Sequence, residues 1–164
     1  MVGEIEFLLT TLSEAGIRYV VVGGVAVVLH GYLRATADLD LVIGLDQPNV
    51  DAAIRTFSHL GLHPRAPVPL HAFADANQRK RWIDEKNLQV FSLWHPAMPG
   101  FEVDIFVEPP MPFEELFGRA SRATIGNAEV PIAAIDDLIE IKRAAGRPRD
   151  VEDIEALLRL KDKK

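Results

Sequence analysis

Apolar residues recur along the chain with two different spacings, and the spacing separates expected helices from expected strands. The first segment carries a stripe with helical spacing, formed by Ile5, Leu8, Leu9 and Leu12. This stripe predicts an amphipathic helix over residues 3–15. Glycine commonly ends helices, and Gly16 is expected to end this one. Residues 19–22 (YVVV) form a short apolar run without alternation, which is typical of a strand buried on both faces.

The same pattern divides the remainder of the chain into alternating helices and strands. Further helices are expected at 25–30, 48–60, 76–87, 113–120, 135–145 and 151–160. Further strands are expected at 39–43, 88–93 and 101–107, followed by a hairpin that turns at Gly126 and Asn127. This order predicts an α/β or α+β fold, with a mixed sheet flanked by helices and a C-terminal helical pair. We expect one domain over residues 1–164, with the sheet region at about 18–132 and the helical pair at 133–164.

Composition narrows the class of protein. The 164 residues are 48% hydrophobic and 26% charged, which suits an ordinary globular domain with its own core. The chain has no cysteine, so disulfides, thiolate nucleophiles and cysteine zinc sites are excluded. A net charge of −6 argues against a broad nucleic-acid-binding surface but leaves room for a local basic pocket. The acidic start lacks the basic segment of a signal peptide and no apolar run is long enough to span a membrane, so we expect a cytoplasmic protein without membrane association.

Two aspartates, Asp38 and Asp40, interrupt the apolar strand expected at 39–43. Side chains alternate along a strand, so these two carboxylates share a face, roughly 7 Å apart. Like charges at this spacing near a core repel one another and resist desolvation, and a bound cation would relieve both costs. Oxygen ligands suit Mg²⁺, with Mn²⁺ as the alternative. A solvated strand end is the competing interpretation.

A third carboxylate lies in the strand "FEVDIFVE". Asp104 sits deep in this strand and shares a face with Glu102, which is nearer the start. If this strand pairs beside residues 39–43, Asp104 joins Asp38 and Asp40 around one site. If it lies at the edge of the sheet, Asp104 simply faces water.

Gly23 and Gly24 follow the first expected strand and open a helix. A helix N-terminus offers free N–H groups and a positive dipole end, and the missing side chains allow a phosphate to approach the backbone. Neither a P-loop nor a dinucleotide-binding fingerprint is present. A tight turn is the plainer interpretation of the pair.

The stretch "VVGGVAVVLHGYLRATADLDLVI", followed by "VDIF", resembles the signature of the nucleotidyltransferase superfamily. That signature is an apolar strand, Gly-Gly or Gly-Ser, a short helix, two aspartates one residue apart and a later strand with a third aspartate. Over residues 18–160 the chain is similar to small stand-alone bacterial members related to AbiEii-type toxins and to aminoglycoside and lincosamide adenylyltransferases. The tail "IKRAAGRPRDVEDIEALL" is close to the Lys-x-x-x-Gly-Arg-x-x-Asp-x-x-Asp pattern of the AbiEii-like branch.

The resemblance implies an enzyme that transfers an NMP unit from an NTP to a hydroxyl acceptor, with two Mg²⁺ ions. Asp38, Asp40 and Asp104 would hold the metal ions, and Asp104 would also be the candidate base. Gly23 and Gly24 would cradle the triphosphate. The acceptor is left open among tRNA, a protein and a small molecule, and a toxin-like role is one of the alternatives. A homodimer or an antitoxin partner would complete the pocket, because the chain lacks the large helical domain of bigger relatives.

Further candidates carry both a structural and a nucleotide-binding interpretation. Lys142 lies on the inward stripe of its helix, either as a boundary lysine or as a phosphate contact. Arg34 and Thr36 either order the loop before Asp38 or bind phosphate. Asp150 is expected to cap the last helix, with Asp153 at the third position. The basic cluster at 79–81 is expected to be a solvated helix face, with a triphosphate or RNA contact as the alternative.

A second interpretation places the chain in a different functional class from the enzymes. A nucleotide-binding regulatory or interaction protein would keep the same pocket without turnover. The three aspartates at 38, 40 and 104 favour the enzyme, because a protein that has lost turnover commonly also loses a metal ligand.

Overall fold

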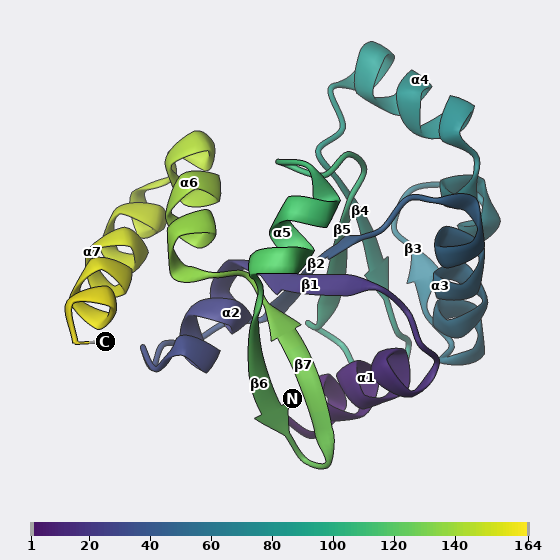
Figure 1. Cartoon of the computed structure of the whole chain (residues 1–164). Coiled ribbons are helices and arrows are strands. Elements are labelled where there is room, and N and C mark those ends of the chain that lie inside the picture. The colour runs from purple at the N-terminus through teal and green to yellow at the C-terminus, as the bar shows by residue number, and fades with distance from the viewer. Residues whose placement is uncertain (1, 164) are drawn as a thin grey trace.

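Residues 2–163 are described by the computed structural model, in which a seven-stranded mixed sheet is surrounded by helices (Figure 1). The strands are β1 (Tyr19–Val22), β2 (Asp38–Ile43), β3 (His63–Pro64), β4 (Val90–Trp94), β5 (Glu102–Phe106), β6 (Ser121–Ile125) and β7 (Ala128–Ile132). The helices are α1 (Val2–Glu14), α2 (Gly23–His30), α3 (Gln47–His59), α4 (Ala76–Lys86), α5 (Phe113–Arg119), α6 (Ile135–Ala145) and α7 (Pro148–Asp162), with a 3₁₀ helix at Leu70–Ala74. The predicted fold class and the C-terminal helical pair are confirmed.

The strand order is β3-β4-β5-β2-β1-β7-β6, so strands distant in sequence meet at the centre of the sheet. β2 pairs antiparallel with β1 and parallel with β5, while β4 pairs antiparallel with the other side of β5. β7 pairs parallel with β1 and forms the predicted hairpin with β6. The side-by-side placement of β2 and β5, on which the third carboxylate depended, is therefore confirmed.

The two faces of the central strands differ in polarity, which decides where the core and the site lie. On one face Leu39, Leu41, Val103 and Ile105 are fully buried. α1 lies on this side, where its Phe7 and Leu8 line a cavity together with Phe101. Polar residues occupy the other face, toward the end of the sheet where α6 and α7 lie together in Figure 1.

Three local expectations are corrected by the structure. The last helix begins at Pro148, because proline is well suited to the first helical turn, and Arg147 is its N-cap. Asp150 is thus the third helical residue rather than the cap, and its carboxylate accepts a hydrogen bond from the Arg147 backbone N–H at 3.0 Å. Arg79 is buried rather than solvated, because it donates to the Phe73 carbonyl and lies over the Phe73 ring.

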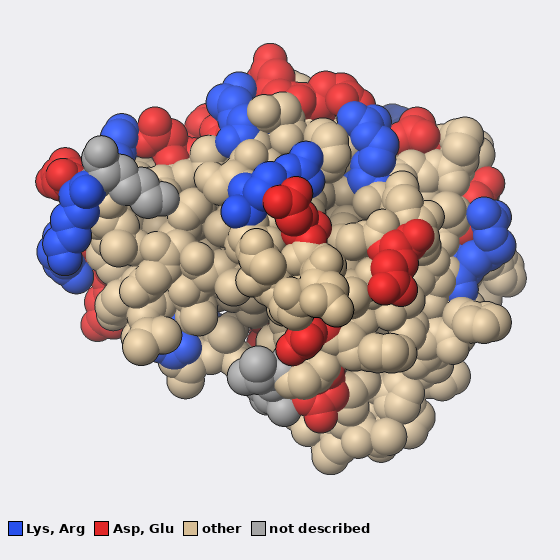
Figure 2. Space-filling model, turned by 60° about the horizontal axis from the view of Figure 1, so that its bottom comes forward, with Lys and Arg blue, Asp and Glu red and all other residues tan. Residues whose placement is uncertain are grey.

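Surface charge is mixed on the face shown in Figure 2, where basic and acidic side chains alternate over a largely uncharged surface. That face has no continuous basic patch. Within residues 2–163, no helix is long and apolar enough to cross a membrane.

Candidate active site

Four acidic residues occupy two adjacent rows across the polar face of the sheet. In the parallel pairing of β2 with β5, Asp40 lies opposite Asp104 and Asp38 lies opposite Glu102. Because paired residues on neighbouring strands point to the same side, all four share one face. The edge-strand alternative for Asp104 is wrong, since β5 has a partner on each side.

Burial and mutual repulsion perturb these carboxylates. Burial, with the charges of Asp104 and Asp38, raises the pKa of Asp40 to about 6. Burial also raises the pKa of Asp104, against the lowering effect of a 2.6 Å hydrogen bond from Ser92 Oγ to its Oδ1. The pKa of Asp38 is raised by burial and by Glu102. The acidic residues on this face therefore repel one another, and a bound cation or proton would reduce that repulsion.

The two glycines make room for side chains of the site itself. Gly23 has φ +68°, and a Cβ there would overlap the Asp40 carboxylate, lying only 2.8 Å from its Cγ. A Cβ on Gly24 would lie 2.7 Å from Arg34 Nη2 and 2.8 Å from Thr36 Oγ1. The N-cap residue of α2 supplies no side-chain hydrogen bond, so the first N–H groups of this helix stay available beside Asp40.

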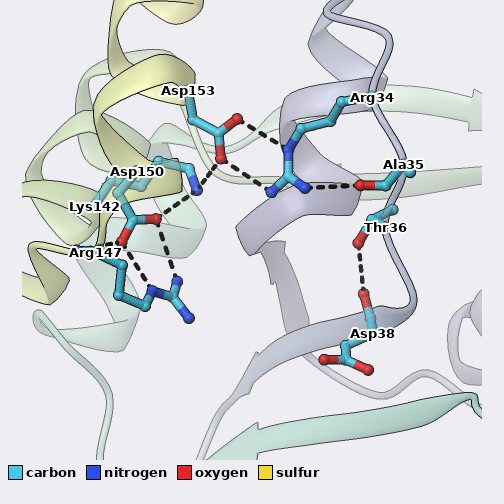
Figure 3. Close-up of polar contacts among 8 residues, drawn as sticks. All are labelled: Arg34, Ala35, Thr36, Asp38, Lys142, Arg147, Asp150 and Asp153. Atoms are coloured by element: carbon cyan, nitrogen blue, oxygen red, sulfur yellow. Dashed lines mark hydrogen bonds and ion pairs between the residues drawn. The ribbon is translucent and has the colours of Figure 1, made fainter.

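Opposite the acids, the C-terminal helices carry a network of ion pairs (Figure 3). Lys142 Nζ lies 3.3 Å from Asp150 Oδ1 and 2.8 Å from Asp153 Oδ2. Asp150 also pairs with Arg147, whose Nε lies 2.9 Å from its Oδ2. Asp153 pairs with Arg34, whose Nε lies 2.9 Å from its Oδ1. We call these five residues the ionic network.

The burial of Lys142 corrects the boundary interpretation. Only 3% of its side chain is exposed, and it is fixed by two buried carboxylates rather than extending to solvent. Arg34 and Thr36 contact the loop before β2: Arg34 Nη1 donates to the Ala35 carbonyl, and Thr36 Oγ1 donates to the Asp38 carbonyl. These contacts favour loop ordering for both residues, and phosphate binding by them stays a prediction.

Two of the acids, Asp40 and Asp104, line one cavity of about 510 Å³ together with two cations of the ionic network. Gly23 and four charged residues, Asp40, Asp104, Lys142 and Arg147, line this cavity. The remaining lining is largely apolar and includes Val90, Phe106, Pro110, Leu138 and Ile141, together with the polar Gln89. The other predicted site residues, Asp38, Gly24, Arg34 and Thr36, are not part of this lining. Arg147 was not among the predicted site residues, although its position directly after the glycine that ends α6 places it near Lys142.

A second cavity of about 360 Å³ lies on the opposite side of the sheet. Apolar side chains dominate its lining, and its titratable residues are Glu4 and His95. Because this lining has a single carboxylate and no lysine or arginine, the chemistry of the site is better placed in the first cavity.

The acids do not make a complete metal cage on their own. Within residues 2–163, no group of three or more His, Asp or Glu side chains is arranged to hold a metal ion. Magnesium in nucleotide enzymes commonly takes one or two carboxylates and completes its coordination with substrate phosphates and water. The in-register pair Asp40 and Asp104, both with raised pKa, fits that mode of binding.

Gly23→Ala is expected to destabilise the protein more than Gly16→Ala. Both glycines have φ near +70°, so each alanine costs about 1–2 kcal/mol of backbone strain. Gly16 has open space around it, whereas a Cβ on Gly23 displaces Asp40, which should add at least about 1 kcal/mol. Urea unfolding measures the difference. Equal losses, or no recovery in Gly23→Ala/Asp40→Ala, would contradict the overlap.

Asp40→Asn is expected to stabilise the metal-free protein at pH 8. The folded pKa of about 6 lies above the ordinary value of 3.8, so the folded state binds more protons between these values. The free energy of unfolding of the wild type should therefore fall as pH rises through that window, and asparagine should recover on the order of 2 kcal/mol. Thermal unfolding in EDTA between pH 4 and 8 measures both effects. A less stable variant at pH 8, or a pH profile like that of the wild type, would exclude a strained Asp40.

Comparison with known proteins places this geometry in a known fold. No protein-family model matches the chain, and no curated protein matches it. In structure it is similar to the lincosamide antibiotic adenylyltransferase LnuA in its lincomycin-bound form, with TM-score 0.64 and 15% identity over 96% of both chains. It is similar to ANT(2'')-Ia in complex with adenylyl-2''-tobramycin, with TM-score 0.61 and 14% identity over 95% of this chain and 86% of that one. A nucleotidyltransferase-like protein from Paracoccidioides brasiliensis matches with TM-score 0.54 and 19% identity over 97% and 75% of the two chains. The resemblance seen in the sequence is confirmed at the level of the fold: the chain has the nucleotidyltransferase fold.

Proposed function

We propose that this protein is a Mg²⁺-dependent nucleotidyltransferase that transfers an NMP unit from an NTP to a hydroxyl group of a small molecule. One observation carries the proposal. Asp40 and Asp104, paired in register, face Lys142 and Arg147 across a single cavity, beside the uncapped start of α2. A magnesium nucleotide is the ligand that presents a cation to the acids and an anion to the bases at once.

Asp40 and Asp104 would hold the magnesium, with Asp38 two residues before Asp40 on the same face of β2. The ions, two by analogy with the family, would neutralise the α-phosphate and the departing pyrophosphate. Lys142 and Arg147 line the same cavity and would contact the triphosphate oxygens through charge-assisted hydrogen bonds. Because Gly23 has no side chain, a phosphate could approach the first backbone N–H groups of α2.

Asp104 would also accept the proton of the acceptor hydroxyl. Ser92 engages Asp104 Oδ1 and fixes the carboxylate, which leaves Oδ2 for the acceptor. The acceptor oxygen would then attack the α-phosphorus while the bond to the bridging oxygen breaks, so that pyrophosphate leaves as the proton moves to Asp104.

Charge favours a small molecule over tRNA as the acceptor. Binding a nucleic-acid backbone requires many lysine and arginine contacts to phosphates. The chain has a net charge of −6, and the surface in Figure 2 mixes both signs. Two fold neighbours are named as an antibiotic adenylyltransferase bound to lincomycin and as a complex with adenylyl-tobramycin, which supports the same choice.

Addition of an NTP with Mg²⁺ is expected to raise the melting temperature of the wild type, because the ligand binds only the folded state. The Asp38→Ala/Asp40→Ala variant should lose this rise, even if its own melting temperature without ligand is higher. Differential scanning fluorimetry with ATP, GTP, CTP and UTP measures the rise, and EDTA is the control. An equal rise in melting temperature in both proteins would contradict the assignment of Asp38 and Asp40 to the nucleotide site.

Asp104→Asn is expected to slow transfer roughly a thousandfold, which corresponds to about 4 kcal/mol of transition-state stabilisation. The matched control is Glu102→Gln, on the same strand and face, which should stay within about tenfold of the wild type. Transfer is measured with radiolabelled NTP against lincosamides, aminoglycosides and other hydroxylated small molecules, with total tRNA as a separate arm.

A folded Asp104→Asn protein with near-normal rates would contradict the proposed base. A larger loss in Glu102→Gln would move that role to Glu102. Transfer to tRNA alone would overturn the small-molecule acceptor, and nucleotide binding without any transfer would favour the regulatory protein.

A further inference from the structure

Asp153 makes more ionic contacts across different parts of the chain than its neighbours in the ionic network. Its side chain is 1% exposed, and both of its oxygens are engaged. Oδ2 accepts from Lys142 Nζ at 2.8 Å and from Arg34 Nη2 at 3.0 Å, while Oδ1 lies 2.9 Å from Arg34 Nε. One carboxylate on α7 thus joins α6 to the loop that leads into β2.

We propose that Asp153 is a positioning residue of the nucleotide site, which holds Lys142 at the cavity and Arg34 against the start of α2. This inference rests on the proposed function, because it concerns how the nucleotide-binding groups are held. Asp153 lies outside the cavity lining, so it would act through these two cations rather than by touching the nucleotide.

The first consequence concerns the lysine. An ammonium group has three N–H donors, and Asp150 and Asp153 occupy two of them. The third is left for the cavity, which Lys142 lines together with Asp40 and Arg147. Without Asp153 the ammonium would be free to turn toward Asp40, whose negative charge attracts it. It would then neutralise a carboxylate that the metal ion needs and leave the phosphate without its partner.

The second consequence concerns the loop. Arg34 Nη2 lies 2.7 Å from the position that a Cβ on Gly24 would take, so a positive charge sits against the positive end of the α2 dipole. Asp153 offsets that repulsion. Two residues further along, Thr36 binds the Asp38 carbonyl, so the segment that Asp153 holds leads directly into the acidic strand. The residue therefore fixes the cationic and the acidic sides of the cavity relative to each other.

Asp150 does not duplicate this function. It binds the backbone and side chain of Arg147 at the start of α7 and shares only Lys142 with Asp153. The ionic network contains three cations and two carboxylates, so the loss of Asp153 leaves a single carboxylate among three positive charges.

The test compares Asp153→Asn with Asp137→Asn. Asp137 is a matched buried aspartate on α6, whose two oxygens accept from Arg119 at 3.0 and 3.1 Å, and it does not line the cavity. Both substitutions preserve shape and break an Asp–Arg pair. The readouts are the dissociation constant of the Mg²⁺-nucleotide that most stabilises the wild type, and the KM and kcat of transfer, with circular dichroism as the folding control.

Asp153→Asn is expected to raise the nucleotide dissociation constant and KM at least tenfold while kcat at saturation stays within about threefold. Asp137→Asn should stay within twofold of the wild type in both. In a Lys142→Met background, Asp153→Asn should raise the dissociation constant by a clearly smaller factor than in the wild-type background, because one of the two cations that it positions is gone. That double variant also serves if Asp153→Asn alone does not fold, since it removes one of the stranded cations.

Wild-type affinity in Asp153→Asn, equal losses in the two single variants, or a full further loss in the Lys142→Met background would each overturn the positioning role and leave the proposed function standing. A wild type that binds none of the four nucleotides with Mg²⁺ would overturn the proposed function, and the positioning role with it.

Discussion

Repulsion between carboxylates on one face of the sheet is the constraint around which the site is built. The parallel pairing of β2 with β5 forces Asp40 and Asp104 into the same row, and burial keeps water from screening them. Neighbouring groups relieve only part of this repulsion: Ser92 donates one hydrogen bond to Asp104, and Lys142 and Arg147 act on Asp40 from across the cavity. Gly23 is needed because no side chain fits beside the Asp40 carboxylate.

The ionic network is better understood as a device for geometry than as a source of stability. Burying charged side chains costs several kcal/mol per ion, and even a good partner often returns no more than that cost. Well-packed apolar residues in place of the whole network would often serve the core as well. Apolar residues would not join α6, α7 and the loop before β2 through specific contacts. They would also present no cation to the acids. The placement of these charges therefore fits a role in ligand binding.

Most of the fold and half of the site follow from local patterns in the sequence. The alternation of Asp38, Leu39, Asp40 and Leu41 predicts their faces, and "VDIF" predicts the third acid, because period-two burial depends only on neighbouring residues. Local patterns do not reveal partners over a hundred positions away. The pair between Arg34 and Asp153 joins residues 119 positions apart. Only the structure shows that this pair forms and that it engages the side chain of Arg34. The same holds for Arg79, where the pattern of a basic helix did not show the Phe73 carbonyl that it binds.

The arrangement of charge also constrains how ligands enter. A nucleotide without metal would bring its phosphates toward Asp40 and Asp104 and be repelled, while a metal ion without nucleotide would find only part of its coordination sphere. In the proposed enzyme each ligand would supply what the other lacks, so the site would couple them, and by linkage each would tighten the binding of the other to the same extent. An acceptor hydroxyl approaching Asp104 would then meet a carboxylate whose repulsion from its neighbours the metal has already relieved. With such coupling, transfer would proceed only when both the metal ion and the nucleotide are bound, because the acids alone would bind either of them poorly.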